Sequence, residues 1–230
     1  MKIIGQPTDY SEILQRVFYA SVASGFVCTL MLANASPTVQ SLLDSVPTKT
    51  DIGPLRGIKA LYVLVPLIIG GISRILKLHD IISNLFRIRY LFDTRCLLFP
   101  LAEGTGITLT KDLQEKIRRN RIDLMYSVFY PYAEFKNPVI DEQLVRTAAD
   151  NWGWFWVFIE SSFLFFVTAA ILVYLRRWNY VFWCLIVVFV ELILLFFLWL
   201  ACRRSGERQI KAILEDPQRR TNITTHFNKL

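Results

Sequence analysis

The chain has 230 residues, of which 53% are apolar and 14% aromatic, and its mean hydropathy is +0.38. This composition is too apolar for an ordinary soluble domain of this length and indicates a membrane protein. The net charge of +7 therefore matters through its distribution between the two sides of a membrane. Four cysteines without a CxxC spacing and only two histidines argue against a disulfide framework or a metal site, and no cofactor is expected.

The first apolar segment runs from about residue 17 to residue 34 and is long enough to cross a membrane as a helix. Ser21 and Gly25 lie four residues apart and give this helix a small-residue face that another helix can approach closely. The segment is therefore predicted to be a transmembrane helix that packs tightly against a neighbour.

The same region also resembles a secretory signal peptide, because Arg16 precedes a 17-residue apolar run that ends in Ala33-Asn34-Ala35. Asp9 and Glu12 in the leader argue against that interpretation. Their spacing instead predicts a helix start, with Asp9 as the N-cap and Glu12 three residues later.

Residues 35–57 are predicted to form a polar loop, and a second apolar segment follows from about residue 58 to residue 75. Its uninterrupted apolar core covers only 13 residues, from Ala60 to Ile72, which is short for a membrane span. Pro66 is expected to bend the helix, and Gly70-Gly71 allows a neighbouring helix to pack close.

Residues 77–151 are more polar and are predicted to form a small helical cytosolic region. The apolar periodicity predicts an amphipathic helix over residues 75–92, a loop over residues 99–106 and a helix from an N-cap at Thr110 to Pro131. A third helix is predicted to begin at Pro138 and to continue toward the next apolar segment.

Four basic side chains lie close together in the middle of the helix that follows Thr110. They are Lys116, Arg118, Arg119 and Arg121. Such a cluster binds anionic lipid headgroups or a soluble phosphate-bearing ligand. The alternative is a solvated helix face on which these cations pair with Asp112, Glu115 and Asp123. Specific binding of double-stranded DNA is not expected.

Residues 152–202 contain two further apolar segments, at about 154–175 and 180–201, joined by the polar turn Arg176-Arg177-Trp178-Asn179. Each has the roughly 20 residues that a transmembrane helix needs, so together they predict a helical hairpin. Residues 203–230 are predicted to form a short helix that ends before Pro217 and a polar, frayed tail.

The distribution of Lys and Arg predicts the topology. The N-terminus carries 2 of them, residues 74–151 carry 12 and the tail carries 7, whereas the two hairpin loops together with Lys59 carry 5. The protein is expected in the plasma (inner) membrane. The positive-inside rule then places both termini and the central region in the cytoplasm. Three spans would leave 7 or 12 of these charges outside, which favours counting the short second segment as a span.

The predicted fold is therefore an all-α polytopic membrane protein with four transmembrane helices. Its predicted regions are an N-terminal transmembrane hairpin (1–76), a cytosolic helical region (77–151), a C-terminal transmembrane hairpin (152–202) and a cytosolic tail (203–230).

Each helix of the second hairpin carries one acidic residue, Glu160 and Glu191. Counted from the turn, their depths differ by about two residues, or roughly 3 Å along the helix. A charge in the bilayer costs at least about 2.5–3.5 kcal/mol on insertion scales, so such residues usually face helices, a partner or water.

One interpretation of this acidic pair is a proton or cation site, or a ring of carboxylates that lines a pore in an oligomer. Hydroxyl groups of Ser161, Ser162 and Thr168 are available to contribute. The alternative is a pair of neutral carboxylic acids that hold helices together, or a salt bridge to Arg74 or Lys59.

Enzymatic activity is not expected. The dipeptide His79-Asp80 occurs without the other ligands of an HD phosphohydrolase, and the sequence has no P-loop, HExxH or Ser/His/Asp set. The first remaining function is an oligomeric membrane channel or membrane-perturbing effector gated through the basic cytosolic helices. Its general layout is similar to that of small membrane effectors of bacterial anti-phage operons.

The second function is a non-enzymatic membrane anchor or assembly subunit that docks a cytosolic protein or an anionic ligand on residues 93–151. The third is a membrane enzyme or transporter. For the channel, a homo-oligomer in contact with membrane lipids is expected.

Overall fold

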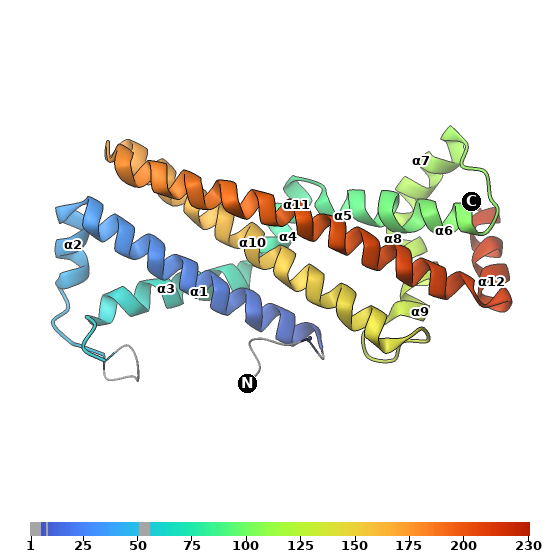
Figure 1. Ribbon diagram of the computed structural model, residues 1–230, viewed down its shortest axis with the longest axis horizontal. Helices are drawn as coiled ribbons and strands as arrows, with labels where there is room; N and C mark the ends of the chain where they lie inside the picture. Colours follow the sequence, from blue (N-terminus) through green and yellow to red (C-terminus); the bar gives the residue numbers. More distant parts are fainter. Residues whose placement is uncertain (1–5, 8, 51–55) are drawn as a thin grey trace. The chain divides into compact units, whose positions relative to one another are not determined.

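The computed structural model describes residues 6–7, 9–50 and 56–230 (Figure 1). Most of these residues are helical, and the β-structure among them is one isolated bridge between Lys49 and Lys59. Three helices are long and apolar enough to cross a membrane, and a bent pair of helices makes a fourth candidate span. The prediction of an all-α polytopic membrane protein is confirmed.

Two compact units make up the chain. The span unit contains Leu14–Ile81 and Gly153–Phe197. The insert unit contains the described residues up to Ile13, together with Ile82–Trp152 and Leu198–Leu230. Residues of the predicted cytosolic region and of the C-terminal tail thus fold in one unit.

Helix α1 (Tyr10–Ala35) begins as the sequence predicts, because Asp9 Oδ1 accepts a hydrogen bond from the Glu12 N–H at 2.9 Å. It packs closely against α3 (Ala60–Leu76), as its small-residue face predicts. A Cβ atom on Gly25 would lie 3.6 Å from Pro66 Cα, and one on Gly70 would lie 2.5 Å from a methyl group of Val22. Larger side chains at either glycine would separate the two helices.

The segment between α1 and α3, predicted as a loop, contains a short helix, α2 (Pro37–Asp44). Ser36 caps it by accepting from the Val39 N–H at 3.4 Å, and Pro37 occupies the first turn, where a missing N–H costs nothing. Residues 51–55 of the predicted loop lie outside the described residues.

The helix predicted over residues 75–92 is broken twice. Lys77 and Arg87 have left-handed backbones, with φ of 49° and 54°, and each ends a helical segment. α3 therefore stops at Leu76, and α4 (Leu78–Leu85) leaves it at an angle of 58°. The apolar periodicity continues through both breaks, and for this reason the sequence pattern did not reveal them.

The predicted C-terminal hairpin consists of α10 (Glu142–Tyr174) and α11 (Trp178–Leu214) (Figure 1). Arg176 adopts a left-handed backbone, with φ of 56°, in the turn between them. α10 is continuous with the predicted third span, but its predicted start at Pro138 is wrong. The N–H groups of Val139 and Ile140 bond to the Tyr132 carbonyl, so this stretch forms a turn before the helix.

Prolines also begin helices in the insert unit where the sequence predicts a loop or an end. α5 (Ile88–Leu91) leads into a π-helix, η2 (Phe92–Leu98), and then into α6 (Phe99–Gly104), where a loop was predicted. Pro100 lies in the first turn of α6, where helices tolerate proline.

Thr110 caps α7 (Lys111–Arg119) as predicted, with the Leu113 N–H donating to its hydroxyl at 3.2 Å. The expected single helix to Pro131 is wrong, because Asn120 interrupts it. It continues as α8 (Arg121–Leu124), a second π-helix η3 (Met125–Phe129) and α9 (Tyr130–Ala133). The wide turn of η3 lies just before Pro131, which occupies the first turn of α9.

The tail was predicted to be frayed, but it forms α12 (Pro217–Asn228). Asp216 caps this helix by accepting from the Arg219 N–H at 2.9 Å. Ile223 and Phe227 are only 1% and 2% exposed, so two apolar side chains in a polar segment are sufficient to pack it.

Candidate functional site

Glu160 is the centre of a buried polar network in the span unit. Its side chain, on α10, is 1% exposed. Oε2 accepts hydrogen bonds from the hydroxyl of Ser21 on α1, at 2.7 Å, and from the hydroxyl of Ser73 on α3. Oε1 accepts from the backbone N–H of His79 on α4 at 3.0 Å and lies 3.1 Å from His79 Nδ1. One carboxylate thus connects four helices.

The break in the second predicted span creates this site. The first N–H groups of a helix have no partner within it, and the partial positive charge at that end attracts anions. His79 lies in the first turn of α4, directly after the break at Lys77, and its N–H is therefore available to Glu160. Broken helices whose ends face buried polar groups occur at the ion and substrate sites of membrane transporters.

The His79 ring is also enclosed, with the residue 3% exposed. It lies against Trp156 on α10, with 5.8 Å between ring centroids. Nε2 has no hydrogen-bond partner in the part of the chain that the structure describes, and Asp80 Oδ1 lies 3.8 Å away. The Asp80 side chain is 29% exposed, so His79 lies between a buried carboxylate and a partly exposed one.

Glu191, on α11, is 8% exposed and has its own set of donors. Ser161 and Ser162 on α10 donate to its two oxygens at 2.6 and 2.8 Å. The Ser161 hydroxyl is also 2.8 Å from that of Ser24 on α1. Among the described residues, Glu160 and Glu191 have no common donor, and Thr168 bonds to neither.

The alternative in which a glutamate forms a salt bridge with Lys59 or Arg74 is wrong. Lys59 Nζ lies 2.8 Å from Asp44 Oδ1, at the end of α2. The Arg74 guanidinium lies over the Phe18 ring, 5.9 Å from its centroid. Within residues 9–50 and 56–230, both glutamates are therefore stabilised by hydrogen-bond donors and not by Lys or Arg.

In the insert unit, the four predicted anion-binding residues have separate partners. Lys116 pairs with Asp112 at 3.1 Å and Arg119 with Glu115 at 2.5 Å, each one turn apart on α7. The Arg118 guanidinium lies 5.6 Å from the Phe99 ring centroid. The fourth, Arg121, contacts a carboxylate outside α7.

Arg121 forms a buried ion pair with Asp93 on η2, at 2.5 Å. The Asp93 side chain is 10% exposed, and burial raises its pKa to about 6 although Arg121 acts in the opposite direction. Burial and the neighbouring Asp93 raise the pKa of Tyr130 to about 12. The pair connects η2 to α8, the segment directly before η3, and π-helical segments are often found at functional sites.

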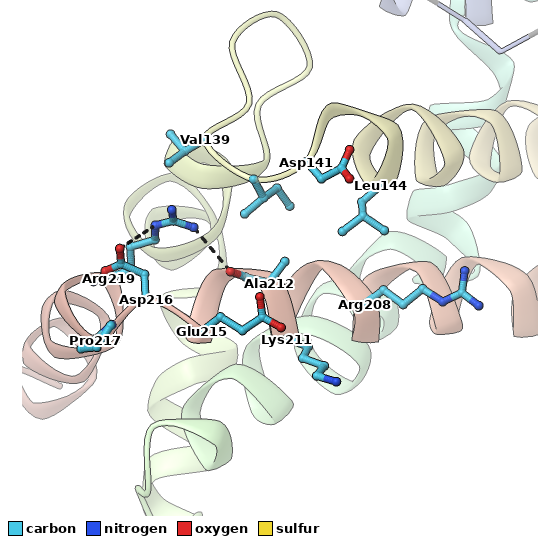
Figure 2. A pocket seen from close by; sticks show the side chains of 11 residues that line it. Val139, Asp141, Leu144, Arg208, Lys211, Ala212, Glu215, Asp216, Pro217 and Arg219 are labelled. Carbon is cyan, nitrogen blue, oxygen red and sulfur yellow. Dashed lines mark hydrogen bonds and ion pairs between the residues drawn. The ribbon is translucent and has the colours of Figure 1, made fainter.

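A groove of about 710 Å³ lies between the start of α10, the end of α11 and the start of α12 (Figure 2). Figure 2 shows Arg219 directed to the Ala212 carbonyl at 3.4 Å and to Asp216 at 3.8 Å. Asp141 and Asp216 act as helix caps through their Oδ1 atoms. The groove also contains apolar side chains and the cations Arg208 and Lys211.

Three residues of the central network were not among the predicted site residues: Ser21, Ser73 and His79. In the sequence, Ser21 indicates close helix packing, and His79 fits only an incomplete metal motif. Within the described residues there is no group of three or more His, Cys, Asp or Glu side chains that could hold a metal ion. One signal in the sequence could have identified His79 as a site residue. It lies at the end of a short apolar segment, and another span of the chain carries an acidic residue that needs a polar partner.

The fold and this network define a helical polytopic membrane protein with polar side chains enclosed among its spans. More particularly, the chain belongs to the YmfE protein family, whose sequence model matches residues 9–228. It is similar to the protein YmfE of Escherichia coli (strain K12), with 25% identity over 108 residues. The aligned part covers 46% of this chain and 42% of that protein. No solved structure matches the chain.

Proposed function

We propose that this protein is an ion-conducting membrane protein in which Glu160 and Glu191 form the ion site. The observation that carries the proposal is the position of Glu160. It is 1% exposed, accepts hydrogen bonds from Ser21, Ser73 and the His79 backbone N–H at the start of α4, and lies 3.1 Å from His79 Nδ1. A carboxylate kept in the interior of apolar helices at such a cost is by default a functional group.

The network extends through the span unit in a way that suits ion movement. Ser24, Ser161 and Glu191 form a continuous series of hydrogen bonds across α1, α10 and α11. Ser21, which bonds to Glu160, lies one turn before Ser24 on α1. Both carboxylates are enclosed by helices of their own chain, so the proposed path lies within one protomer and does not need a ring of carboxylates.

The charge distribution supports a plasma (inner) membrane location with both termini in the cytoplasm. In this arrangement the insert unit is cytosolic. Its basic helices regulate ion movement through the span unit. The buried Asp93–Arg121 pair is the interaction that a bound ligand would disturb. Fusion of a reporter active only outside the cytoplasm to the C-terminus should give no activity, and activity there would contradict this topology.

The proposal is tested with purified protein in liposomes that contain a fluorescent indicator for H⁺, K⁺ or Na⁺. Wild-type protein should conduct at least one of these ions. Glu160→Gln and Glu191→Gln should lower that flux, whereas Glu103→Gln, at an exposed position on α6, should not. Absence of flux of all three ions with the correctly folded protein would rule out the ion-conducting function.

The groove in Figure 2 favours a second candidate, a membrane anchor that docks a cytosolic partner. Its apolar side chains and its cations Arg208 and Lys211 suit a peptide segment with an acidic residue. A photocrosslinking amino acid at Leu144 should capture that partner in cells. The same amino acid at exposed Thr221 is the control, and equal labelling at both positions would count against this function.

A further inference from the structure

We infer that the ion at the Glu160 site is a proton, and that His79 passes it from Asp80 to Glu160. This inference rests on the proposed function and assigns its ion. Two distances carry it: His79 Nδ1 is 3.1 Å from Glu160 Oε1, and His79 Nε2 is 3.8 Å from Asp80 Oδ1. An imidazole with a carboxylate at each nitrogen is arranged to receive a proton on one side and to release one on the other.

The exposure of the three side chains gives the transfer a direction. The Asp80 side chain is 29% exposed, that of His79 4% and that of Glu160 1%. Trp156 lies against the imidazole ring and restricts its orientation. The most exposed of the three side chains is therefore that of Asp80, although its Oδ1 atom facing Nε2 is itself buried, and the imidazole lies between it and the Glu160 carboxylate.

The step at Nδ1 leaves the heavy atoms in place, whereas the Asp80 side chain first rotates to bring its Oδ1, 3.8 Å from Nε2, within hydrogen-bond distance. At the start, His79 is neutral with its proton on Nδ1, which donates to ionised Glu160, and Nε2 carries a lone pair. A proton from Asp80 binds to Nε2, and the Nδ1 proton moves to Glu160 Oε1. Glu160 is then a neutral acid that donates to the Nδ1 lone pair, and Nε2–H faces the Asp80 carboxylate. One proton has moved inward, and the number of protons on His79 is unchanged.

The partners of Glu160 suit a proton better than a metal cation. Hard cations require several oxygen ligands with available lone pairs. Here two of the four contacts to Glu160 come from His79 nitrogen atoms, and the backbone N–H has no lone pair to offer. The other two come from the Ser21 and Ser73 hydroxyls, so among the described partners the shell offers a cation only these two neutral oxygens beside the carboxylate. Protonation needs no change in this shell.

Flux through reconstituted protein separates the proton from other cations. Wild-type proteoliposomes should carry H⁺, and His79→Gln should reduce that flux at least tenfold, with a smaller reduction in Asp80→Asn. The control is His226→Gln, since His226 is the other histidine and is exposed on α12. Flux of K⁺ or Na⁺ without H⁺ would overturn the inference and leave the proposed function intact, whereas no flux of any ion would overturn both.

A second measurement does not depend on conduction or on the folding of a His79 variant. In His226→Gln, His79 is the one remaining histidine, so ¹⁵N-histidine NMR of that protein in nanodiscs reports on this ring alone. We expect the proton to reside on Nδ1 at high pH and on Nε2 once Glu160 is protonated. Glu160→Gln should abolish this exchange. A ring that keeps one tautomer throughout the titration would overturn the inference.

Discussion

Glu160 and Asp93 are both buried carboxylates, but their surroundings are of opposite kinds. Glu160, in the span unit, has donors from Ser21, Ser73 and His79 and no Lys or Arg among its described partners. Asp93, in the insert unit, faces the guanidinium of Arg121 at 2.5 Å. The neutral donors around Glu160 stabilise its charge and also join the helices from which they come. The single cation beside Asp93 neutralises the charge of that carboxylate locally.

Loss of the Glu160 carboxylate should have the largest effect of any substitution considered. Glu160→Ala leaves three donor residues without an acceptor inside the span unit, and we expect a loss of stability of about 3–5 kcal/mol. The free energy of unfolding in mixed micelles measures it. Glu103→Ala is the matched control, and equal effects of the two substitutions would show that the network does not hold the helices.

Stability should also depend on the protonation of Asp93. Its ordinary pKa of 3.8 is raised to about 6 in the fold, so the folded state holds a proton that the unfolded state releases between these values. Stability from this group is therefore present below pH 3.8 and is lost as pH rises to about 6. About two pKa units correspond to a change of about 3 kcal/mol.

Unfolding of wild type and of Asp93→Asn at a series of pH values separates this contribution from the others. The difference in free energy between the two proteins should change mainly between pH 4 and pH 6. A constant difference over this range would mean that Asp93 titrates normally.

The ion pair itself should matter less than the Glu160 network. Arg121→Ala leaves Asp93 buried, but Asp93 is able to take up a proton, which limits the loss to about 1–3 kcal/mol near neutral pH. The double variant Arg121→Ala/Asp93→Asn should recover part of it. If the stability lost in the double variant equals the sum of the stability lost in the two single variants, the two residues do not interact.

The Glu191 site should respond more weakly to the loss of one donor. Ser161→Ala removes one of two hydroxyl donors, and a loss of about 1 kcal/mol is expected. Ser162→Ala is the natural comparison, because Ser161 also contacts Ser24 and should cost more. Chemical unfolding of both variants provides the measurement, and the reverse order would argue against the link to α1.

The smallest change in stability is expected on the exposed face of α7. Lys116→Ala and Arg119→Ala each break a one-turn ion pair and should change stability by less than about 0.5 kcal/mol. If these cations bind anionic lipid, each substitution should weaken binding to acidic vesicles about fivefold, because one charge near the surface contributes about 1 kcal/mol to binding. Unchanged vesicle sedimentation would favour the solvated-face interpretation.

The sequence was sufficient to predict the helical membrane fold, the hairpin of α10 and α11 and that both glutamates face helices, a partner or water. Long apolar runs and rare charges within them are strong local signals. Helix breaks at Lys77 and Arg87 were not predicted, because left-handed residues other than glycine leave no pattern in hydropathy. The break at Asn120, whose φ is −97° and ψ is 20°, leaves no pattern in hydropathy either. The partners of Glu160 come from two distant stretches of the chain, α1 and the broken segment α3–α4, and only the tertiary packing brings them together.

The left-handed backbone at Lys77 has a consequence for how a buried charge is held. A lysine in that conformation costs about 1 kcal/mol relative to glycine. In an unbroken helix the His79 N–H would bond to a backbone carbonyl of the preceding turn. The break leaves this N–H available, and it donates to Glu160 instead. A local conformational cost in one segment thus creates the binding partner for a side chain more than 80 positions later.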